Sequence, residues 1–83
     1  MKVQIKYFAS IREALGRSGE ECETGAATLA QLRAELLARG GAYAEALAPG
    51  RALRMALNQV MADEAAVLTE GSEVAFFPPV TGG

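Results

Sequence analysis

The stretch Val74-Ala75-Phe76-Phe77-Pro78-Pro79-Val80-Thr81-Gly82-Gly83 ends the chain and decides how the rest of it is interpreted. Its first four residues form a short apolar run of strand-favouring types, which predicts a buried strand. Because proline has no N–H to donate to a neighbouring strand, the two prolines predict that this strand ends at Phe77. They also hold the backbone near the extended region, so we expect residues 78–83 to form an extended tail beyond a folded domain of residues 1–77.

The tail ends in two residues that have no side chain. Gly82 and Gly83 can pass through a channel that would exclude a Cβ atom, and they leave the final carboxylate open to attack from either face. The alternative is a frayed terminus that happens to contain two glycines. At a glycine frequency of about 7%, such a pair ends roughly 0.5% of chains by chance. We therefore favour a functional terminus at Gly82-Gly83.

Composition is typical of a small single-domain protein. The chain has 83 residues, a hydrophobic fraction of 51% and a net charge of −2, and its length allows one modest core. It has no basic stripe for nucleic acid, no signal peptide, and no run of the roughly 18–20 apolar residues that a membrane span requires. One cysteine cannot form an internal disulfide. We therefore expect a soluble cytoplasmic protein that binds neither nucleic acid nor membrane.

The residue types that perform most enzyme chemistry are missing from the sequence. Without histidine and with one cysteine, there is no ligand set for zinc. There is also no Ser/His/Asp or Cys/His set and no glycine-rich phosphate loop, so we expect no metal or cofactor on this chain. If the protein takes part in an enzymatic reaction, most catalytic groups must come from a partner. Cys22 lies in an acidic run that raises a thiol pKa, and we interpret it as structural.

The first third of the chain predicts a strand, a short helix and a second strand. Residues 2–8 alternate between apolar and polar types, as in a half-buried strand, with Phe8 on the polar side at its end. Ser10-Ile11-Arg12-Glu13 has the Ser-x-x-Glu form of a capping box, so a helix is expected to start at Ser10. Gly16 is placed to end this helix in a left-handed cap. The acidic residues 20–23 predict a strand at a sheet edge.

The middle of the chain predicts the main helix. Thr28-Leu29-Ala30-Gln31 is a second capping box, and an apolar stripe follows it at helical spacing. The stripe consists of Leu29, Leu32, Leu36 and Leu37. Gly40-Gly41 is expected to stop this helix. Residues 42–48 then form one or two further helical turns before Pro49-Gly50 turns the chain.

The last third predicts the remaining strands. Residues 53–61 indicate a strand pair or a bent strand, with the bend near Asn58-Gln59, and residues 66–68 form a short extended piece between turns. The first and last strands are the two most apolar, so we expect them to pair. The predicted fold class is α+β, a mixed sheet with one main helix packed on one face.

Four stretches resemble a known family. They are Lys6–Ala9 running into Ile11–Glu13, the Thr28 helix, Leu57–Gln59 and Gly71–Gly83. Together they cover nearly the whole chain; the last is the most specific, and residues 42–51 match least. The chain resembles the small subunits of molybdopterin synthase, which are sulfur-carrier proteins of the ubiquitin-like β-grasp family. The resemblance implies a β-grasp domain with a projecting Gly-Gly tail.

The resemblance also implies a role in molybdenum cofactor biosynthesis. An E1-like adenylating enzyme would consume ATP to convert the Gly83 carboxylate into a nucleotide-bound acyl-adenylate, and a sulfur donor would turn this into a thiocarboxylate. The tail would then enter the active site of the synthase large subunit, where its sulfur attacks a cyclic pterin precursor. The chain would be a non-catalytic, sulfur-donating subunit of a heterotetramer, in which tethering supplies proximity.

The family docks its partners through an apolar patch on the open face of the sheet. Alternation along the last strand places Phe76 in the core and Phe77 outside, with Phe8 beside it. Together with Met61, Phe8 and Phe77 would form this patch by position; the alternative is that they fill the core. The predicted partner-binding residues are Phe8, Met61, Phe77, Pro78, Pro79, Val80 and Thr81.

Two other functions remain open. The chain could carry sulfur for thiamine synthesis or tRNA thiolation, although Pro78-Pro79-Val80 and the paired phenylalanines argue against this. It could also be a ubiquitin-like modifier or a plain binding module. Arg12 could contact the activating enzyme, but solvation of the first helix is favoured. The carboxylates of Glu20, Glu21 and Glu23 lack metal-ligand spacing, and we interpret them as a solvated edge.

Overall fold

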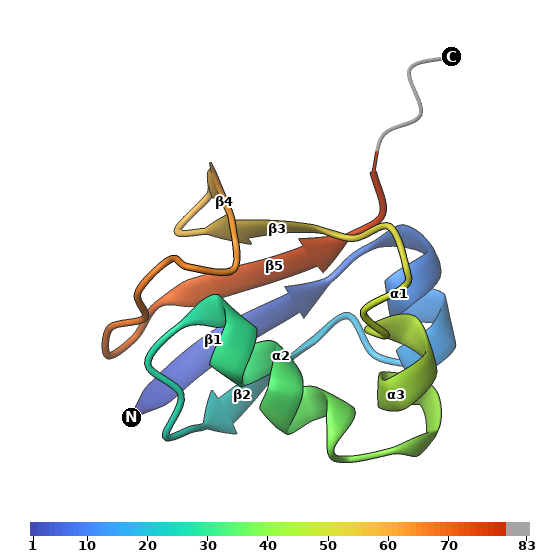
Figure 1. The fold of residues 1–83 in the computed structure, drawn as a ribbon, viewed down its shortest axis with the longest axis horizontal. Helices are drawn as coiled ribbons and strands as arrows, with labels where there is room; N and C mark the ends of the chain where they lie inside the picture. Colours follow the sequence, from blue (N-terminus) through green and yellow to red (C-terminus); the bar gives the residue numbers. More distant parts are fainter. Residues whose placement is uncertain (80–83) are drawn as a thin grey trace.

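The fold is a mixed five-stranded sheet with helices packed against it. A computed structural model of the chain describes residues 1–79. In chain order the elements are β1 (Lys2–Tyr7), α1 (Ala9–Leu15), β2 (Gly19–Glu23), α2 (Leu29–Leu37), α3 (Gly41–Ala46), β3 (Arg54–Leu57), β4 (Val60–Ala62) and β5 (Glu73–Phe77). The strand order across the sheet is β2-β1-β5-β3-β4 (Figure 1). Within residues 1–79, no helix is long and apolar enough to cross a membrane.

The first and last strands form the centre of the sheet. β1 pairs with β5 in parallel, so the prediction that these two strands pair is confirmed. The other pairings, β1 with β2, β3 with β5 and β3 with β4, are antiparallel. β2 is an edge strand, as its acidic sequence predicts. β5 has a neighbour on each side, so the strand that leads into Pro78 is hydrogen-bonded along both of its edges.

The predicted bend at Asn58-Gln59 is a tight hairpin between β3 and β4. Both residues have positive φ, 51° and 68°, which is the backbone of the two-residue turns that match the twist of paired strands. The Asn58 side chain accepts a hydrogen bond from the backbone N–H of Glu73 at 2.9 Å. Asparagine suits this position because it tolerates positive φ better than most residues.

The main helix, α2, begins where its capping box predicts. The Thr28 hydroxyl accepts a hydrogen bond from the N–H of Gln31 at 3.3 Å. Leu29, Leu32 and Leu36 are fully buried against the sheet, and Leu37 is partly buried. The prediction that Gly40-Gly41 ends this helix is wrong. α2 ends at Leu37 with Ala38 as its C-cap, and the glycines instead lead into α3, where Gly40 has a φ of 74°.

The capping box predicted for the first helix is also wrong. α1 begins at Ala9, and Phe8 is the extended residue before it; no side chain caps this end, and Ser10 lies inside the first turn. The Phe8 N–H donates to the carbonyl of Phe76 at 3.1 Å, so the sheet ladder continues up to the helix. The prediction for the other end is confirmed: Gly16 has a φ of 72° and donates to the Arg12 carbonyl at 2.9 Å.

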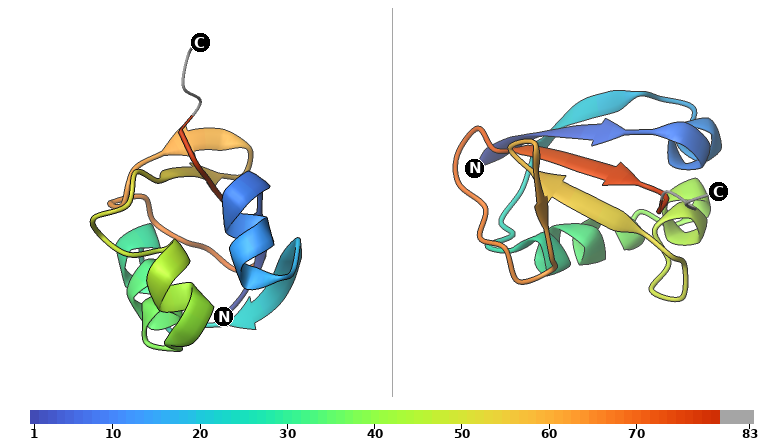
Figure 2. Two further views of the ribbon diagram at one scale, coloured as in Figure 1. Left: turned by 90° about the vertical axis from the view of Figure 1, so that its right-hand side faces the viewer. Right: turned by 90° about the horizontal axis from the view of Figure 1, so that it is seen from above.

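The sheet has one covered face and one open face. α2 and α3 lie on one side, and α1 lies at the end toward which β1 and β5 point (Figures 1 and 2). The right-hand view of Figure 2 looks onto the strands with α2 and α3 behind them. The largest fully buried side chains are Tyr7, Phe76, Ile5, Leu29, Leu32, Leu36, Leu47, Val3 and Val74. The core therefore lies between the sheet and α2, which leaves the second face of the sheet available to a partner.

Candidate functional site

The two phenylalanines at the end of β5 face opposite sides of the sheet. Phe76 is fully buried, whereas Phe77 is only partly buried and lies on the open face. Phe8 is 44% exposed, and its ring meets that of Phe77 edge to face, with centroids 6.5 Å apart and planes at 84°. The predictions that Phe76 belongs to the core and that Phe8 lies beside Phe77 are confirmed.

Met61 lies on the same face, two strands from Phe77. It pairs with Ala56, which in turn pairs with Ala75 on β5. Because strand residues alternate between faces, Ala75 and Phe77 point to the same side. Met61 is 58% exposed, so it does not fill the core.

We call this group of apolar residues on the open face, in which the two alanines are nearly buried, the outer patch. It consists of Phe8, Ala56, Met61, Ala75 and Phe77. The two alanines were not predicted as members. They are small and lie between the larger side chains, so the patch is low in its middle and has aromatic and thioether side chains at its ends.

The first two residues of the predicted tail, Pro78 and Pro79, follow Phe77 of the outer patch. Pro78 and Pro79 are half-buried and follow directly on β5. Pro78 borders a small cavity of about 70 Å³ between α1, α3 and the loop that precedes β3. Its other lining residues are Ser10, Ile11, Ala14, Ala46, Arg51 and Ala52. The first residue of the tail is therefore seated on the domain. Val80, Thr81, Gly82 and Gly83, which the sequence predicts to bind or react, lie outside the described residues.

A polar network supports the buried side of the same region. The Glu20 carboxylate accepts hydrogen bonds from the hydroxyls of Tyr7 at 2.8 Å and Tyr43 at 2.7 Å, and from Arg39 at 2.8 Å. The ring of Tyr7 stacks on Phe76, with centroids 6.2 Å apart. The interpretation of Glu20 as a solvated edge residue is therefore wrong: its carboxylate joins β2 to α3 and to the segment after α2.

The network shifts the titration of its members. Burial raises the pKa of Glu20, but the hydrogen bonds from Tyr43, Arg39 and Tyr7 outweigh it, so the pKa lies below its usual value. Burial and the neighbouring Glu20 carboxylate raise the pKa of Tyr7. At neutral pH, Glu20 is therefore ionised and both tyrosines donate to it. Nothing in the sequence signalled this cluster, because its members come together only in the folded chain.

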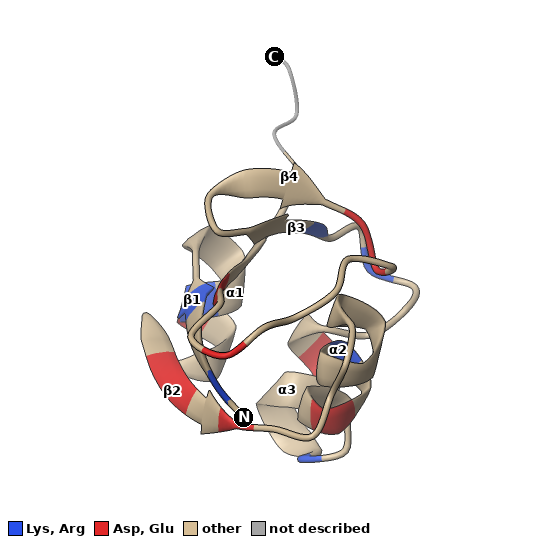
Figure 3. Ribbon diagram, turned by 90° about the vertical axis from the view of Figure 1, so that its left-hand side faces the viewer, with Lys and Arg blue, Asp and Glu red and all other residues tan. Residues whose placement is uncertain are grey.

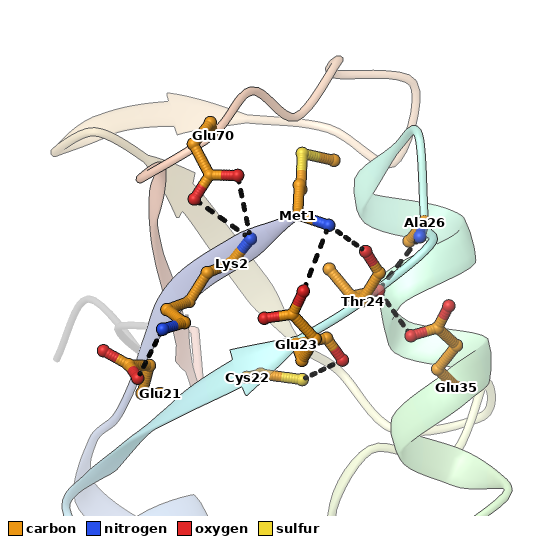
Figure 4. Close-up of polar contacts among 9 residues, drawn as sticks. All are labelled: Met1, Lys2, Glu21, Cys22, Glu23, Thr24, Ala26, Glu35 and Glu70. Atoms are coloured by element: carbon orange, nitrogen blue, oxygen red, sulfur yellow. Dashed lines mark hydrogen bonds and ion pairs between the residues drawn. The ribbon is translucent and has the colours of Figure 1, made fainter.

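The other acidic residues of β2 fit their predicted place at a solvated edge. Glu21 is exposed and pairs with Lys2 at 3.4 Å, and Glu23 pairs with the N-terminal amino group at 3.6 Å (Figure 4). Cys22, between them, points inward and is buried. Burial is the main cause of the raised pKa of its thiol, whereas Arg39 acts in the opposite direction. Within residues 1–79, no group of three or more potential ligands could hold a metal ion.

The buried side chain of one arginine was not predicted from the sequence. Arg33 lies on α2 beside the apolar stripe and donates to the carbonyls of Leu47 at 2.8 Å and Ala48 at 2.7 Å. Its guanidinium also pairs with Glu64 at 3.4 Å. These bonds fix the chain between α3 and β3. Arg51, which lines the cavity beside Pro78, follows in the same stretch, and its N–H donates to the Ala48 carbonyl at 2.9 Å.

Comparison with known proteins agrees with this geometry. The model of the ThiS family matches residues 5–83. The molybdopterin synthase sulfur carrier subunit of Escherichia coli (strain K12) is 40% identical over 81 residues, which cover 98% of this chain and 99% of that protein. The subunit of the same name from Haemophilus influenzae is 37% identical over 81 residues, with the same coverage.

Solved structures show the same fold. In a complex of subunits 1 and 2 of the molybdopterin-converting factor from Helicobacter pylori, one chain matches with a TM-score of 0.70 and 27% identity, covering all of both chains. Small archaeal modifier protein 1 from Haloferax volcanii matches with a TM-score of 0.77 and 25% identity, also over all of both chains. The fold is thus the predicted ubiquitin-like β-grasp. The chain belongs to the ThiS family, and its predicted resemblance to the sulfur-carrier subunits of molybdopterin synthase is confirmed.

Proposed function

We propose that this chain is the sulfur carrier of a molybdopterin synthase and that the carboxylate of Gly83 is its reactive group. One observation supports this most strongly: the chain matches curated sulfur carrier subunits over almost its full length and ends in Gly82-Gly83. The described residues supply a suitable base for such a terminus. β5 is held on both sides, and Pro78 is seated on the domain directly after it.

The chemistry follows from the poor reactivity of a carboxylate. An ionised carboxylate is a weak electrophile, so an adenylating enzyme first joins the Gly83 carboxyl group to AMP, with release of pyrophosphate from ATP. A sulfur donor then displaces AMP and leaves a thiocarboxylate, whose sulfur is a good nucleophile. In the large subunit this sulfur attacks the pterin precursor, and two such deliveries build the dithiolene that later holds molybdenum.

This chain contributes docking and delivery, while the large subunit contributes acid–base groups and substrate binding. The outer patch is the proposed contact surface, with Phe77 and Phe8 as anchors, because clustered exposed aromatic groups are typical centres of protein interfaces. Pro78 and Pro79 start the tail that enters the partner. The solved complex of subunits 1 and 2 from H. pylori supports a large-subunit partner. We extend the proposal to a heterotetramer of two small and two large subunits.

Deletion of Gly83 tests the proposal. The thiolated wild-type chain, mixed with the large subunit and the pterin precursor, should form the dithiolene. The variant that lacks Gly83 should bind the large subunit through the intact outer patch and form no dithiolene. Dithiolene formation by the deletion variant would rule the proposal out. The identity of the large subunit that co-purifies would distinguish molybdenum cofactor synthesis from thiamine synthesis or tRNA thiolation.

A protein modifier is the second candidate. The full-length structural match to small archaeal modifier protein 1 favours it, since the same fold and a Gly-Gly terminus suit isopeptide formation. Mass spectrometry of total protein from cells that express a tagged chain would reveal it. Lysine residues that carry the chain's terminus would support a modifier, and their absence in cells with active sulfur transfer would support the carrier.

A further inference from the structure

The cations of this chain fall into two groups. Of eight lysine and arginine residues, five form ion pairs with carboxylates. The paired residues are Lys2, Lys6, Arg17, Arg33 and Arg39. Arg12, Arg51 and Arg54 form no ion pair within residues 1–79, and all three are exposed. The positions of these three unpaired arginines in the fold indicate what they could bind.

Two of these arginines stand beside the aromatic anchors of the outer patch. Arg54 is the direct cross-strand partner of Phe77 in the β3–β5 ladder, so its side chain leaves the sheet on the same, open face. Arg12 on α1 and Phe8 line one shallow groove that runs along β1 to the start of β2, where Glu20 also lines it. Each phenylalanine of the aromatic pair therefore has an arginine among its neighbours.

The third arginine stands beside the root of the tail. Arg51 lines the cavity that Pro78 borders, and its Nε donates to the backbone carbonyl of Glu45 at 3.2 Å, which leaves its charge uncompensated by a carboxylate. We call Arg12, Arg51 and Arg54 the basic collar. The carboxylates of Glu13 and Glu45 lie on neighbouring helices but form no ion pair with it among the described residues.

At the opposite end of the sheet, the positive groups are paired with carboxylates. There the N-terminal amino group pairs with Glu23, and Lys2 pairs with Glu21 (Figure 4). Figure 3 shows the acidic residues along β2, at the edge of the sheet away from β4. The chain as a whole carries a net charge of −2. Within residues 1–79, the positive charge that no carboxylate pairs is thus concentrated near Phe77 and Pro78, at the start of the tail.

We propose that the basic collar steers docking onto the large subunit, whose surface around the tail's entry carries carboxylates. The inference rests on the proposed function and adds the electrostatic character of the partner. Exposed charges around an apolar contact act mainly on the association rate, because they attract the partner before contact and remain hydrated after it. The guanidinium fork also matches carboxylate geometry, which helps to set the orientation of the encounter.

The test measures association and dissociation rates with the large subunit by stopped-flow fluorescence over a range of salt concentrations. The variant Arg12→Gln/Arg51→Gln/Arg54→Gln should associate about tenfold more slowly than the wild type at low salt, with a dissociation rate changed by less than about twofold. The difference should vanish near 1 M salt, where the Debye length falls to about 3 Å. The charge-retaining variant Arg12→Lys/Arg51→Lys/Arg54→Lys should associate like the wild type.

Lys2→Gln is the control for charge at the far end of β1, and it should leave the association rate nearly unchanged. Equal association rates and equal salt dependence of the glutamine variant and the wild type would rule out steering by the basic collar while leaving the carrier function intact. Faster association of the glutamine variant would also overturn it, because it would indicate a basic partner surface. Failure of the wild-type chain to bind the large subunit at all would overturn the proposed function and the collar together.

Discussion

Phe8 and Phe77 meet edge to face on the open side of the sheet, 6.5 Å apart, although one follows the first strand and the other ends the last. The parallel pairing of β1 with β5 produces this contact, because it brings the ends of both strands to the same end of the sheet. One residue earlier, Phe76 is fully buried. Adjacent phenylalanines thus serve different purposes, and substitution should separate them.

Phe77→Ala should weaken binding to the large subunit by about 2 kcal/mol or more, as expected for an aromatic anchor. Phe76→Ala should instead lower the free energy of unfolding by about 3–5 kcal/mol, because it opens a cavity in the core. Isothermal titration calorimetry and urea denaturation measure the two effects. Val67→Ala is the control, since Val67 is exposed and not part of the outer patch. Wild-type affinity in Phe77→Ala would exclude the patch as the docking surface.

Glu20→Gln should lower the free energy of unfolding by about 1–3 kcal/mol at neutral pH, because two tyrosine hydroxyls and Arg39 lose an ionised acceptor. Hydrogen bonds from Tyr43, Arg39 and Tyr7 outweigh burial and hold the pKa of Glu20 in the folded chain below its usual value. Its stabilising contribution is therefore complete above the unfolded-state pKa and is lost as the pH falls through the folded-state pKa. The difference between wild type and variant should shrink on acidification.

Urea denaturation of both proteins between neutral and acidic pH measures this difference. Glu13→Gln is the matched control, since Glu13 is exposed on α1, and it should change the free energy of unfolding by less than about 0.5 kcal/mol. If the free energies of unfolding of the wild type and Glu20→Gln differ by the same amount down to the most acidic pH, the ionised carboxylate does not have this role.

Gln59→Gly should stabilise the chain by about 0.5–1 kcal/mol. Gln59 has a φ of 68° in the β3–β4 turn, where a side chain is strained and glycine is not. Asn58→Ala should do the opposite, because it loses the side-chain bond to Glu73 and keeps the positive φ. Thermal unfolding by circular dichroism compares the two variants. A lower melting temperature for Gln59→Gly would mean that the glutamine side chain has a stabilising contact.

Cys22→Ala should leave sulfur loading of the terminus unchanged. The thiol is buried and its pKa is raised, so little of it is the reactive thiolate at neutral pH. The rate of thiocarboxylate formation with the adenylating enzyme and a sulfur donor measures this. A folded Cys22→Ala variant that no longer loads sulfur would show that the cysteine relays it.

The central strand pair, the acidic edge strand and much of the core could be predicted from local sequence patterns, whereas the places of β3 and β4 in the sheet were not predicted. Alternation along residues 2–8 and 74–77 identified the two central strands, and helical spacing identified the buried leucines of α2. The starts and ends of helices were harder. Ser10 matches a capping pattern, yet the sheet ladder extends to Phe8 and starts the helix at Ala9 before the serine can cap it.

The candidate site also contains residues that local patterns predict and residues that they do not. The positions of Phe77 and Phe8 follow from alternation and strand pairing, and both were predicted. Arg33 and Glu20 were missed, because each gains its role from partners on other elements that no local pattern reveals. The basic collar was missed for the same reason: its three arginines are scattered in sequence and gather only because β3 begins where β1 and β5 end.

The mass of the intact chain shows whether the carboxylate of Gly83 receives sulfur. The protein is incubated with an adenylating enzyme, ATP and a sulfur donor, and its mass is compared with that of the untreated chain and of the variant lacking Gly83. The wild-type mass should show that one oxygen of the terminus has been replaced by sulfur, and the mass of the deletion variant should be unchanged. An unaltered wild-type mass, with the enzyme shown to be active on its own carrier, would contradict it.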